Sequence, residues 1–116
     1  MITAGQLLDF VLENRTDKVF KGFSKEEVAA AINEGIEDGT LFYATDGEKI
    51  TGMILGEKIE TPKVIFVTEN LAMSLKTLMI FARMANERFP GYRLEAMRHD
   101  RHRKFNTEQL YRKLKI

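Results

Sequence analysis

Charged and hydrogen-bonding side chains are concentrated at one end of this chain. Residues 97–116, MRHDRHRKFNTEQLYRKLKI, contain seven Lys and Arg residues and both histidines of the sequence. Residues 1–89 carry 10 Lys and Arg against 14 Asp and Glu, a balance of −4, whereas residues 90–116 carry 8 against 3, a balance of +5. A basic end attracts phosphate groups, nucleic acid or an acidic protein. The basic loop of this end contains Arg98, Arg101, Arg103 and Lys104.

This basic loop has two interpretations. In the first it is a solvated loop, and the cations that follow it complement the dipole at the end of a helix. In the second it binds an anion, either the phosphates of a small molecule or nucleic acid, whose binding would weaken steeply with salt. The charge is not accompanied by a helix-turn-helix, zinc-finger or RNA-binding sequence signature.

His99 and His102 lie three residues apart in the same stretch. A metal site would need a third ligand from elsewhere, and the sequence has no H-E-x-x-H or comparable spacing. The chain has no cysteine, which excludes disulfides and thiolate metal ligands. We therefore predict a solvated loop for the two histidines and no metal site.

Glu69 is the carboxylate whose position suggests chemistry, because it follows a predicted strand and precedes a predicted helix. It could act as a general base that deprotonates an incoming amine directly or through water. The alternative is a surface carboxylate that the dipole of the following helix stabilises.

The composition predicts one globular domain over residues 1–116, since 44% of the residues are hydrophobic and 30% are charged. No apolar run approaches the roughly 20 residues that a membrane span needs. The N-terminal MITAGQLLDF lacks the basic start and apolar core of a signal peptide. We therefore expect a cytoplasmic protein without a membrane partner.

Capping signals predict where the first two helices begin. Thr3-x-x-Gln6 and Ser24-x-x-Glu27 both have the spacing of a capping box, and apolar residues follow each at helical intervals. The first helix is expected over about residues 4–14, and Gly39 is placed to end the second.

The hydrophobic period then changes to that of strands. Strands are expected at 41–45, 49–59 and 63–68, with Asp46-Gly47 as a hairpin turn and Gly52 and Gly56 as marks of a bulge or close packing. A helix over 74–88 should end at Phe89-Pro90-Gly91, followed by a strand at 92–97 and a last helix that Asn106 caps.

The expected order is therefore α-α-β-β-β-α-β-α. It predicts an α+β fold with a mixed, mainly antiparallel sheet and helices on its faces. The three-strand meander would be joined to the fourth strand by a crossover helix, which makes that last pair parallel. Such a sheet has a crevice where its strands diverge, and ligands favour crevices of this kind.

Two stretches resemble the GNAT superfamily of N-acetyltransferases. The stretch GTLFYATDGEKITGMILGEKI is similar to that family's second and third strands, with an Asp-Gly turn and an I-x-G strand. The stretch NTEQLYRKL is similar to its late Asn…Leu-Tyr…Leu helix. The resemblance covers about residues 24–114 and is one of pattern and order.

The resemblance implies acetyl-CoA as cofactor and an amine, on a small molecule or a protein, as acceptor. The pantetheine arm would pair with the backbone at Phe66, Val67 and Thr68, and Asn106 would contact the cofactor or the substrate. Tyr111 would protonate the departing CoA thiolate, a task that suits a phenol with a pKa near 10.

The chain departs from the family's pattern at the pyrophosphate. The family carries Arg/Gln-x-x-Gly-x-Gly/Ala at the start of the central helix, whereas residues 70–77 here contain no glycine. Ser74 and Lys76 could offer a hydroxyl and a charge beside the helix N-terminus. The first strand is also missing or reduced, and the sequence ends where the family would have two more strands. The chain thus resembles a minimal or degenerate member of the kind that phages encode.

Two functions remain open on the sequence alone. The first is an acetyl-CoA-dependent N-acetyltransferase. The second is a catalytically inactive binding module that keeps the fold and uses its basic C-terminal surface on nucleic acid or on an acidic protein. The sheet edge left after the last helix also favours a homodimer.

Overall fold

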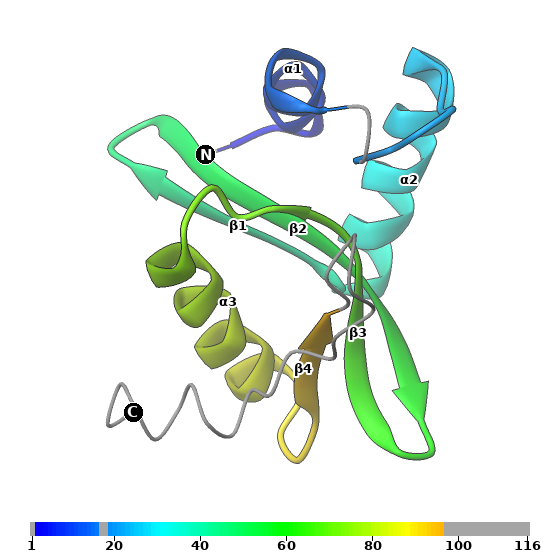
Figure 1. Ribbon diagram of the computed structural model, residues 1–116, viewed down its shortest axis with the longest axis vertical. Helices are drawn as coiled ribbons and strands as arrows, with labels where there is room; N and C mark the ends of the chain where they lie inside the picture. The colour runs from blue at the N-terminus through cyan, green and yellow to red at the C-terminus, as the bar shows by residue number, and fades with distance from the viewer. Residues whose placement is uncertain (1, 17–18, 97–116) are drawn as a thin grey trace.

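The computed structural model describes residues 2–16 and 19–96 of the chain (Figure 1). The described elements follow the expected order α-α-β-β-β-α-β. The predicted last helix, residues 106–116, lies outside the described residues. The elements are α1 (Ala4–Asn14), α2 (Lys25–Asp38), β1 (Leu41–Asp46), β2 (Lys49–Glu60), β3 (Lys63–Leu71), α3 (Leu75–Arg88) and β4 (Arg93–Ala96).

The predicted caps of the first two helices are confirmed. Thr3 and Gln6 form a capping box at α1, and Ser24 and Glu27 form a second at α2. In each box the hydroxyl accepts a backbone N–H from the first turn, and the longer side chain accepts the N–H of the capping residue. Gly39 ends α2 with φ 75°, a left-handed conformation that glycine adopts without strain.

The four strands form one curled, mixed sheet in the order β1-β2-β3-β4. The meander β1-β2-β3 is antiparallel, as predicted. Its first turn is Gly47-Glu48, with Gly47 at φ 64°, one residue later than the predicted Asp46-Gly47, because Asp46 still pairs with Lys49 at the end of β1. β3 and β4 are parallel, also as predicted, and pair from Val64–Arg93 to Val67–Ala96. The crossover through α3 thus places the end of β3 beside the start of the helix (Figure 1).

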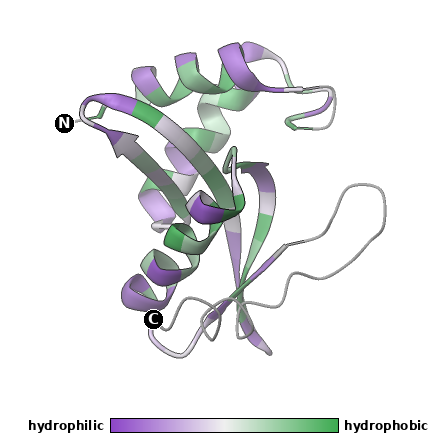
Figure 2. Cartoon of the chain, turned by 60° about the vertical axis from the view of Figure 1, so that its left-hand side comes forward, coloured by the Kyte–Doolittle hydropathy of each residue, from purple (hydrophilic) through white to green (hydrophobic). Residues whose placement is uncertain are grey.

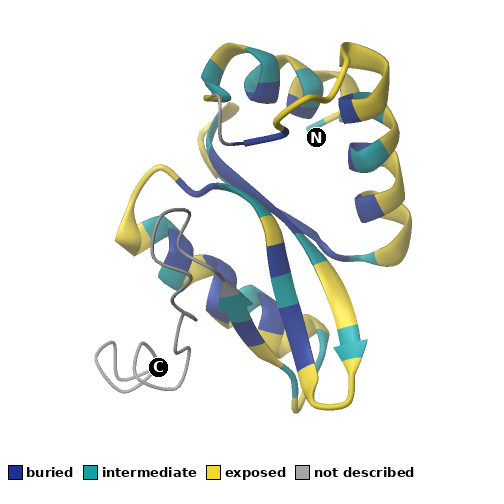
Figure 3. Ribbon diagram, turned by 45° about the vertical axis from the view of Figure 1, so that its right-hand side comes forward, coloured by how far each residue is buried: buried dark blue, intermediate teal, exposed yellow. Residues whose placement is uncertain are grey.

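Helices cover both faces of this sheet, because alternate strand residues point to opposite sides. We call the two sides the α3 face and the α1–α2 face, and Figure 3 shows buried residues of each helix turned toward the strands. Figure 2 shows hydrophobic and hydrophilic residues interspersed along the helices. On the α3 face, Phe81, Ala82 and Ala85 pack against strand residues such as Phe42, Ile54, Ile65 and Leu94. On the α1–α2 face, Leu7, Val11, Val28 and Ile32 pack against Leu41, Met53, Leu55 and Leu71.

None of the helices in the described ranges 2–16 and 19–96 is long and apolar enough to cross a membrane.

Candidate functional site

The structure gathers the described part of the predicted site at the end of β3 and the start of α3. Phe66, Val67 and Thr68 are consecutive on β3, Glu69 follows them, and Ser74 and Lys76 lie at the start of α3. The other predicted residues lie outside the described part of the chain. They are Asn106, Tyr111, His99, His102 and the basic loop residues Arg98, Arg101, Arg103 and Lys104.

A β-bulge at Thr68 divides β3 into two halves. Leu55 pairs with Glu69 and Gly56 pairs with Val67, so Thr68 is an extra residue with no opposite partner on β2. Its hydroxyl instead donates a hydrogen bond to the Leu55 carbonyl oxygen at 3.2 Å. Bulges bend a strand and re-aim its side chains, and they are frequent beside binding sites. Here the bulge directly follows Val67, the last β3 residue whose pairing with β4 the structure describes.

Phe66 and Val67 point to opposite faces of the sheet. Val67 is buried in the core on the α3 face, whereas Phe66 pairs with Glu57 on β2 and Glu95 on β4 and is half-buried. The backbones of both residues pair with β2 and with β4, so of the two only the half-buried aromatic side chain of Phe66 is available to a ligand.

Glu69 anchors a distant loop. Both of its carboxylate oxygens accept the backbone N–H of Phe20, each at 3.1 Å. Phe20 is buried in the core of the α1–α2 face and has φ 54°, an unusual conformation for a residue with a side chain. The carboxylate thus stabilises the loop between α1 and α2 against β3. Sequence reasoning missed this role, since the two residues are 49 positions apart.

The turn between β3 and α3 is held by local polar contacts. Asn70 Oδ1 accepts the Ala72 N–H at 2.9 Å, and Ser74 Oγ accepts the Thr77 N–H at 3.1 Å as the N-cap of α3. The Ser74 hydroxyl is therefore already part of the helix cap, while Lys76 is exposed on the first turn. Between these contacts Met73 adopts φ 68° with its side chain 60% exposed.

Gly52 explains why this turn lies so close to the sheet. A Cβ atom at Gly52 would come within 2.8 Å of both the Ala72 carbonyl oxygen and Thr77 Cγ2. A Cβ at Gly56 would meet Ile65 Cγ2 at 2.8 Å, and Gly56 adjoins the bulge. The prediction that these glycines mark a bulge or close packing is confirmed.

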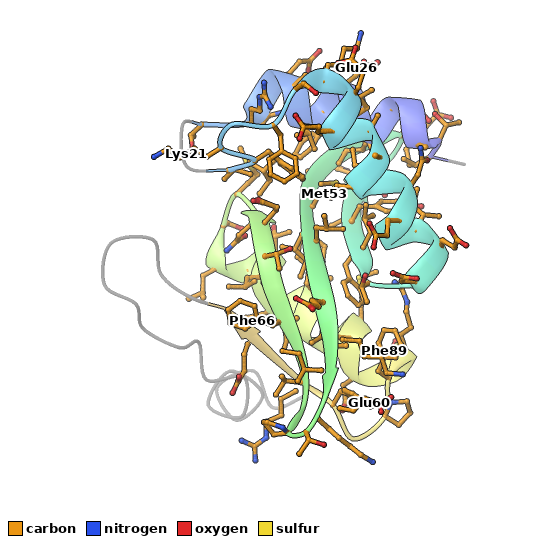
Figure 4. All side chains as sticks on the ribbon, turned by 90° about the vertical axis from the view of Figure 1, so that its right-hand side faces the viewer. Lys21, Glu26, Met53, Glu60, Phe66 and Phe89 are labelled. Atoms are coloured by element: carbon orange, nitrogen blue, oxygen red, sulfur yellow. The ribbon has the colours of Figure 1, made fainter. Side chains whose placement is uncertain are left out.

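A groove of about 520 Å³ opens beside the bulge, between α2 and the β2–β3 hairpin. We call it the α2 groove, and Figure 4 views this side, with α2 next to β2 and with β3, which carries Phe66, beyond it. Three carboxylates line the α2 groove. The groove was not predicted from the sequence. Its polar lining includes Glu34, Asp38, Thr40, Glu57, Lys58 and Thr68.

A second groove, of about 650 Å³, lies between α1 and the β1–β2 hairpin. We call it the α1 groove; it is lined by Asp9, Glu13, Glu48 and Lys49 together with Phe10 and the exposed Met73. Among the residues that the structure describes, no group of three or more His, Asp or Glu side chains could hold a metal ion.

Comparisons of the chain with protein-family models, with curated proteins and with solved structures found no match.

Proposed function

We propose that this chain is a GNAT-like domain that binds acetyl-CoA and transfers the acetyl group to an amine. The observation that supports the proposal is the geometry at Thr68. The parallel β3–β4 pair, the bulge that bends β3 and the N-terminus of α3 follow one another within a short stretch of chain. An extended pantetheine arm needs a strand with backbone groups at an open edge, and its pyrophosphate suits a helix N-terminus.

The described residues offer the pantetheine arm one position on β3. Thr68, which lies beyond the described β3–β4 pairing, would supply backbone groups to the arm, whereas the backbones of Phe66 and Val67 pair with β2 and with β4 and do not fit the role expected for them. At the start of α3 the dipole and the exposed Lys76 favour an anion, but Ser74 is engaged as the cap and the stretch 70–77 has no glycine to let the backbone approach closely. We therefore expect binding that is weaker than a glycine-rich turn would give.

In this proposal, named groups polarise the thioester, protonate the thiolate and accept the amine proton. Acetyl-CoA would supply the acetyl group as a thioester, which the acceptor amine attacks directly. A backbone N–H near the bulge would polarise the thioester carbonyl, and Tyr111 would protonate the thiolate. Because Glu69 already accepts the Phe20 N–H, it would receive the amine proton through a water, or water alone would take it. Holding two substrates in orientation can provide much of the rate.

Calorimetry and thermal shift with acetyl-CoA test the proposal, using a matched pair of charge reversals on α3. Lys76→Glu places a negative charge beside the proposed pyrophosphate, so it should weaken acetyl-CoA binding roughly tenfold. Arg83→Glu makes the same charge change on an exposed residue of the same helix and should leave the affinity unchanged. Absence of heat and of thermal shift at millimolar acetyl-CoA would remove the proposal.

A second candidate function is a binding module without catalytic activity. Two observations support it. Glu69 and Ser74, two of the predicted site residues, are occupied by backbone N–H groups, and residues 90–116 carry a balance of +5. Such a module would bind nucleic acid or an acidic protein through Arg98, Arg101, Arg103 and Lys104. Anisotropy titrations of labelled DNA and RNA at two salt concentrations should show affinity that falls steeply with salt. Absent or salt-insensitive binding would exclude nucleic acid and leave a pull-down to test the acidic protein.

A further inference from the structure

We propose that the α2 groove binds an organic amine that carries more than one positive charge. The proposal does not rest on acyl transfer or on acetyl-CoA, because its carboxylates and its hydroxyl lie on α2, on β2 and in the segment between α2 and β1, and it shares only Thr68 with the acetyl-CoA site. It is carried by three properties of the groove: its size, its uncompensated negative charge and a buried hydroxyl group in its wall.

The negative charge comes from two elements. Glu34 and Asp38 lie four residues apart on α2, which puts them on the same side of the helix, and Glu57 lies across the groove on β2. None of the three forms an ion pair with another residue that the structure describes. Three carboxylates around one concave surface produce a negative potential that attracts cations.

Lys58 is the cation in the groove lining, and it does not neutralise these carboxylates. Its ammonium group lies 5.3 Å from the ring centroid of Phe89 and 5.2 Å from that of Tyr92. Both aromatic residues pack against the core of the α3 face, on the other side of the sheet. The lysine is thereby directed away from the groove by cation–π contacts.

Thr40 provides the second, independent observation. It lines the groove, only 4% of its surface is exposed, and it is the buried polar residue of the described core. Its backbone N–H and carbonyl are paired with Gly35 and Gly56, but its hydroxyl has no hydrogen-bond partner among the described residues. Buried hydroxyls are almost always hydrogen-bonded, to protein, water or a ligand. An ammonium group in the groove would give this hydroxyl a donor.

Size and spacing define the class of ligand. A volume of about 520 Å³ lies within the range of small-molecule sites, which runs from roughly 300 to 1,000 Å³. The carboxylates do not converge closely enough to form a metal site within the described ranges. A linear diamine or triamine carries several positive charges spaced along its carbon backbone. Such a ligand can pair with separated carboxylates at the same time, which a single ion cannot.

The test is a titration of the isotope-labelled full chain with spermidine, followed by amide NMR in the absence of acetyl-CoA. We expect saturable shifts centred on the amides of Gly35, Thr40 and Gly56. n-Butylamine, which has one charge, should bind roughly tenfold more weakly or not measurably, since it can meet only one carboxylate at a time. Equal affinities for the two amines would overturn the proposal.

Two charge-matched triple variants locate the site. Glu34→Gln with Asp38→Asn and Glu57→Gln should weaken spermidine binding roughly tenfold or more. Asp9→Asn with Glu13→Gln and Glu48→Gln makes the same change in net charge in the α1 groove and should have little effect. Equal weakening by both variants would mean non-specific attraction and would overturn the proposal.

Thr40→Val tests the hydroxyl separately, because valine has nearly the same shape and lacks the polar atom. We expect it to weaken spermidine binding severalfold while the dispersed amide spectrum stays folded. Unchanged binding in this variant would overturn the role of the hydroxyl. Because none of these measurements contains CoA, loss of spermidine binding leaves the acetyl-CoA proposal intact, and the reverse also holds.

Discussion

The two faces of the sheet are built differently. A single helix closes the α3 face: Phe81 and Ala85 are completely buried, and Arg88 donates to the carbonyl oxygens of Gly39 and Leu41 at 2.7 and 2.9 Å. The guanidinium of Arg88 also lies 4.3 Å from the centroid of the Phe42 ring. Two helices and a loop share the α1–α2 face, and the loop is held to the sheet by the Glu69 carboxylate.

This difference also appears in where the described grooves lie. The α1 groove and the α2 groove both border the α1–α2 face, and a smaller groove of about 350 Å³ lies in the loop between these helices. A helix that crosses over between two parallel strands is fixed at both ends by the sheet. The pair α1 and α2 packs on the opposite face, and concave surfaces lie at its borders with the strands. We infer that the α3 face mainly stabilises the fold, whereas the three grooves described above border the α1–α2 face.

The largest expected effect follows from truncating the core on the α3 face. Phe81→Ala leaves a cavity at a completely buried position and should lower the free energy of unfolding by about 3–5 kcal/mol. Ile80→Ala changes the neighbouring residue, which is 42% exposed, and should change that free energy by no more than about 0.5 kcal/mol. Urea denaturation measures both. A loss below about 1 kcal/mol for Phe81→Ala would contradict the stabilising role of this face.

The elements of both faces could be predicted because their signals are local. Thr3, Ser24 and Gly39 act within a few residues of the helix ends that they fix, so the sequence contains the whole capping interaction. The same holds for the hairpin turn between β1 and β2, which joins strands adjacent in the chain, although it begins at Gly47 rather than at Asp46. The parallel β3–β4 pair was predictable from the length of the crossover and the fixed hand of such connections.

The candidate site was predictable only as a stretch of chain. Phe66, Val67 and Thr68 lie on one strand, as expected. The bulge at Thr68 depends on the register between β2 and β3, which the alternation of hydrophobic and polar residues does not specify. The partner of Glu69 depends on the left-handed backbone of Phe20, far away in sequence. The α2 groove depends on the distance between α2 and β2, where Gly35 lets the helix lie close to Leu41 and Leu55.

The second prediction concerns the attachment of the α1–α2 face. Glu69→Gln keeps the size of the side chain but removes the charge from its hydrogen bonds to the Phe20 N–H. Hydrogen bonds to charged groups are stronger than neutral ones, so the free energy of unfolding should fall by about 1–2 kcal/mol. Glu13→Gln, on an exposed residue of α1, is the control and should change it by less than about 0.5 kcal/mol.

Hydrogen exchange sharpens this second prediction. In Glu69→Gln the Phe20 amide should exchange faster, whereas the amides of Phe81 and Ala85 on the α3 face should lose protection only by the global change in stability. An equal local loss of amide protection on both faces would mean that Glu69 does not anchor the α1–α2 face specifically. Unchanged protection of the Phe20 amide would contradict the anchoring role of the carboxylate.

The smallest expected effect compares the two capping boxes of the α1–α2 face, which differ in charge. The backbone N–H of Ser24 and then its hydroxyl lower the pKa of Glu27 below its ordinary value of 4.5, whereas Gln6 at the matching position of α1 does not titrate. A lowered pKa means that the ionised carboxylate stabilises the folded state above pH 4.5, and this contribution disappears as the pH falls through the pKa of the folded state.

Exchanging the two boxes isolates this effect. Glu27→Gln should be less stable than the natural chain near neutral pH, and the difference should vanish in acid. Gln6→Glu should do the opposite on α1, where no acidic residue lies in the first turn, and gain stability only where the new carboxylate is ionised. Urea denaturation from about pH 3 to about pH 7 measures both differences. A difference for Glu27→Gln that is constant with pH would mean that its box acts by geometry alone, as the box of α1 does.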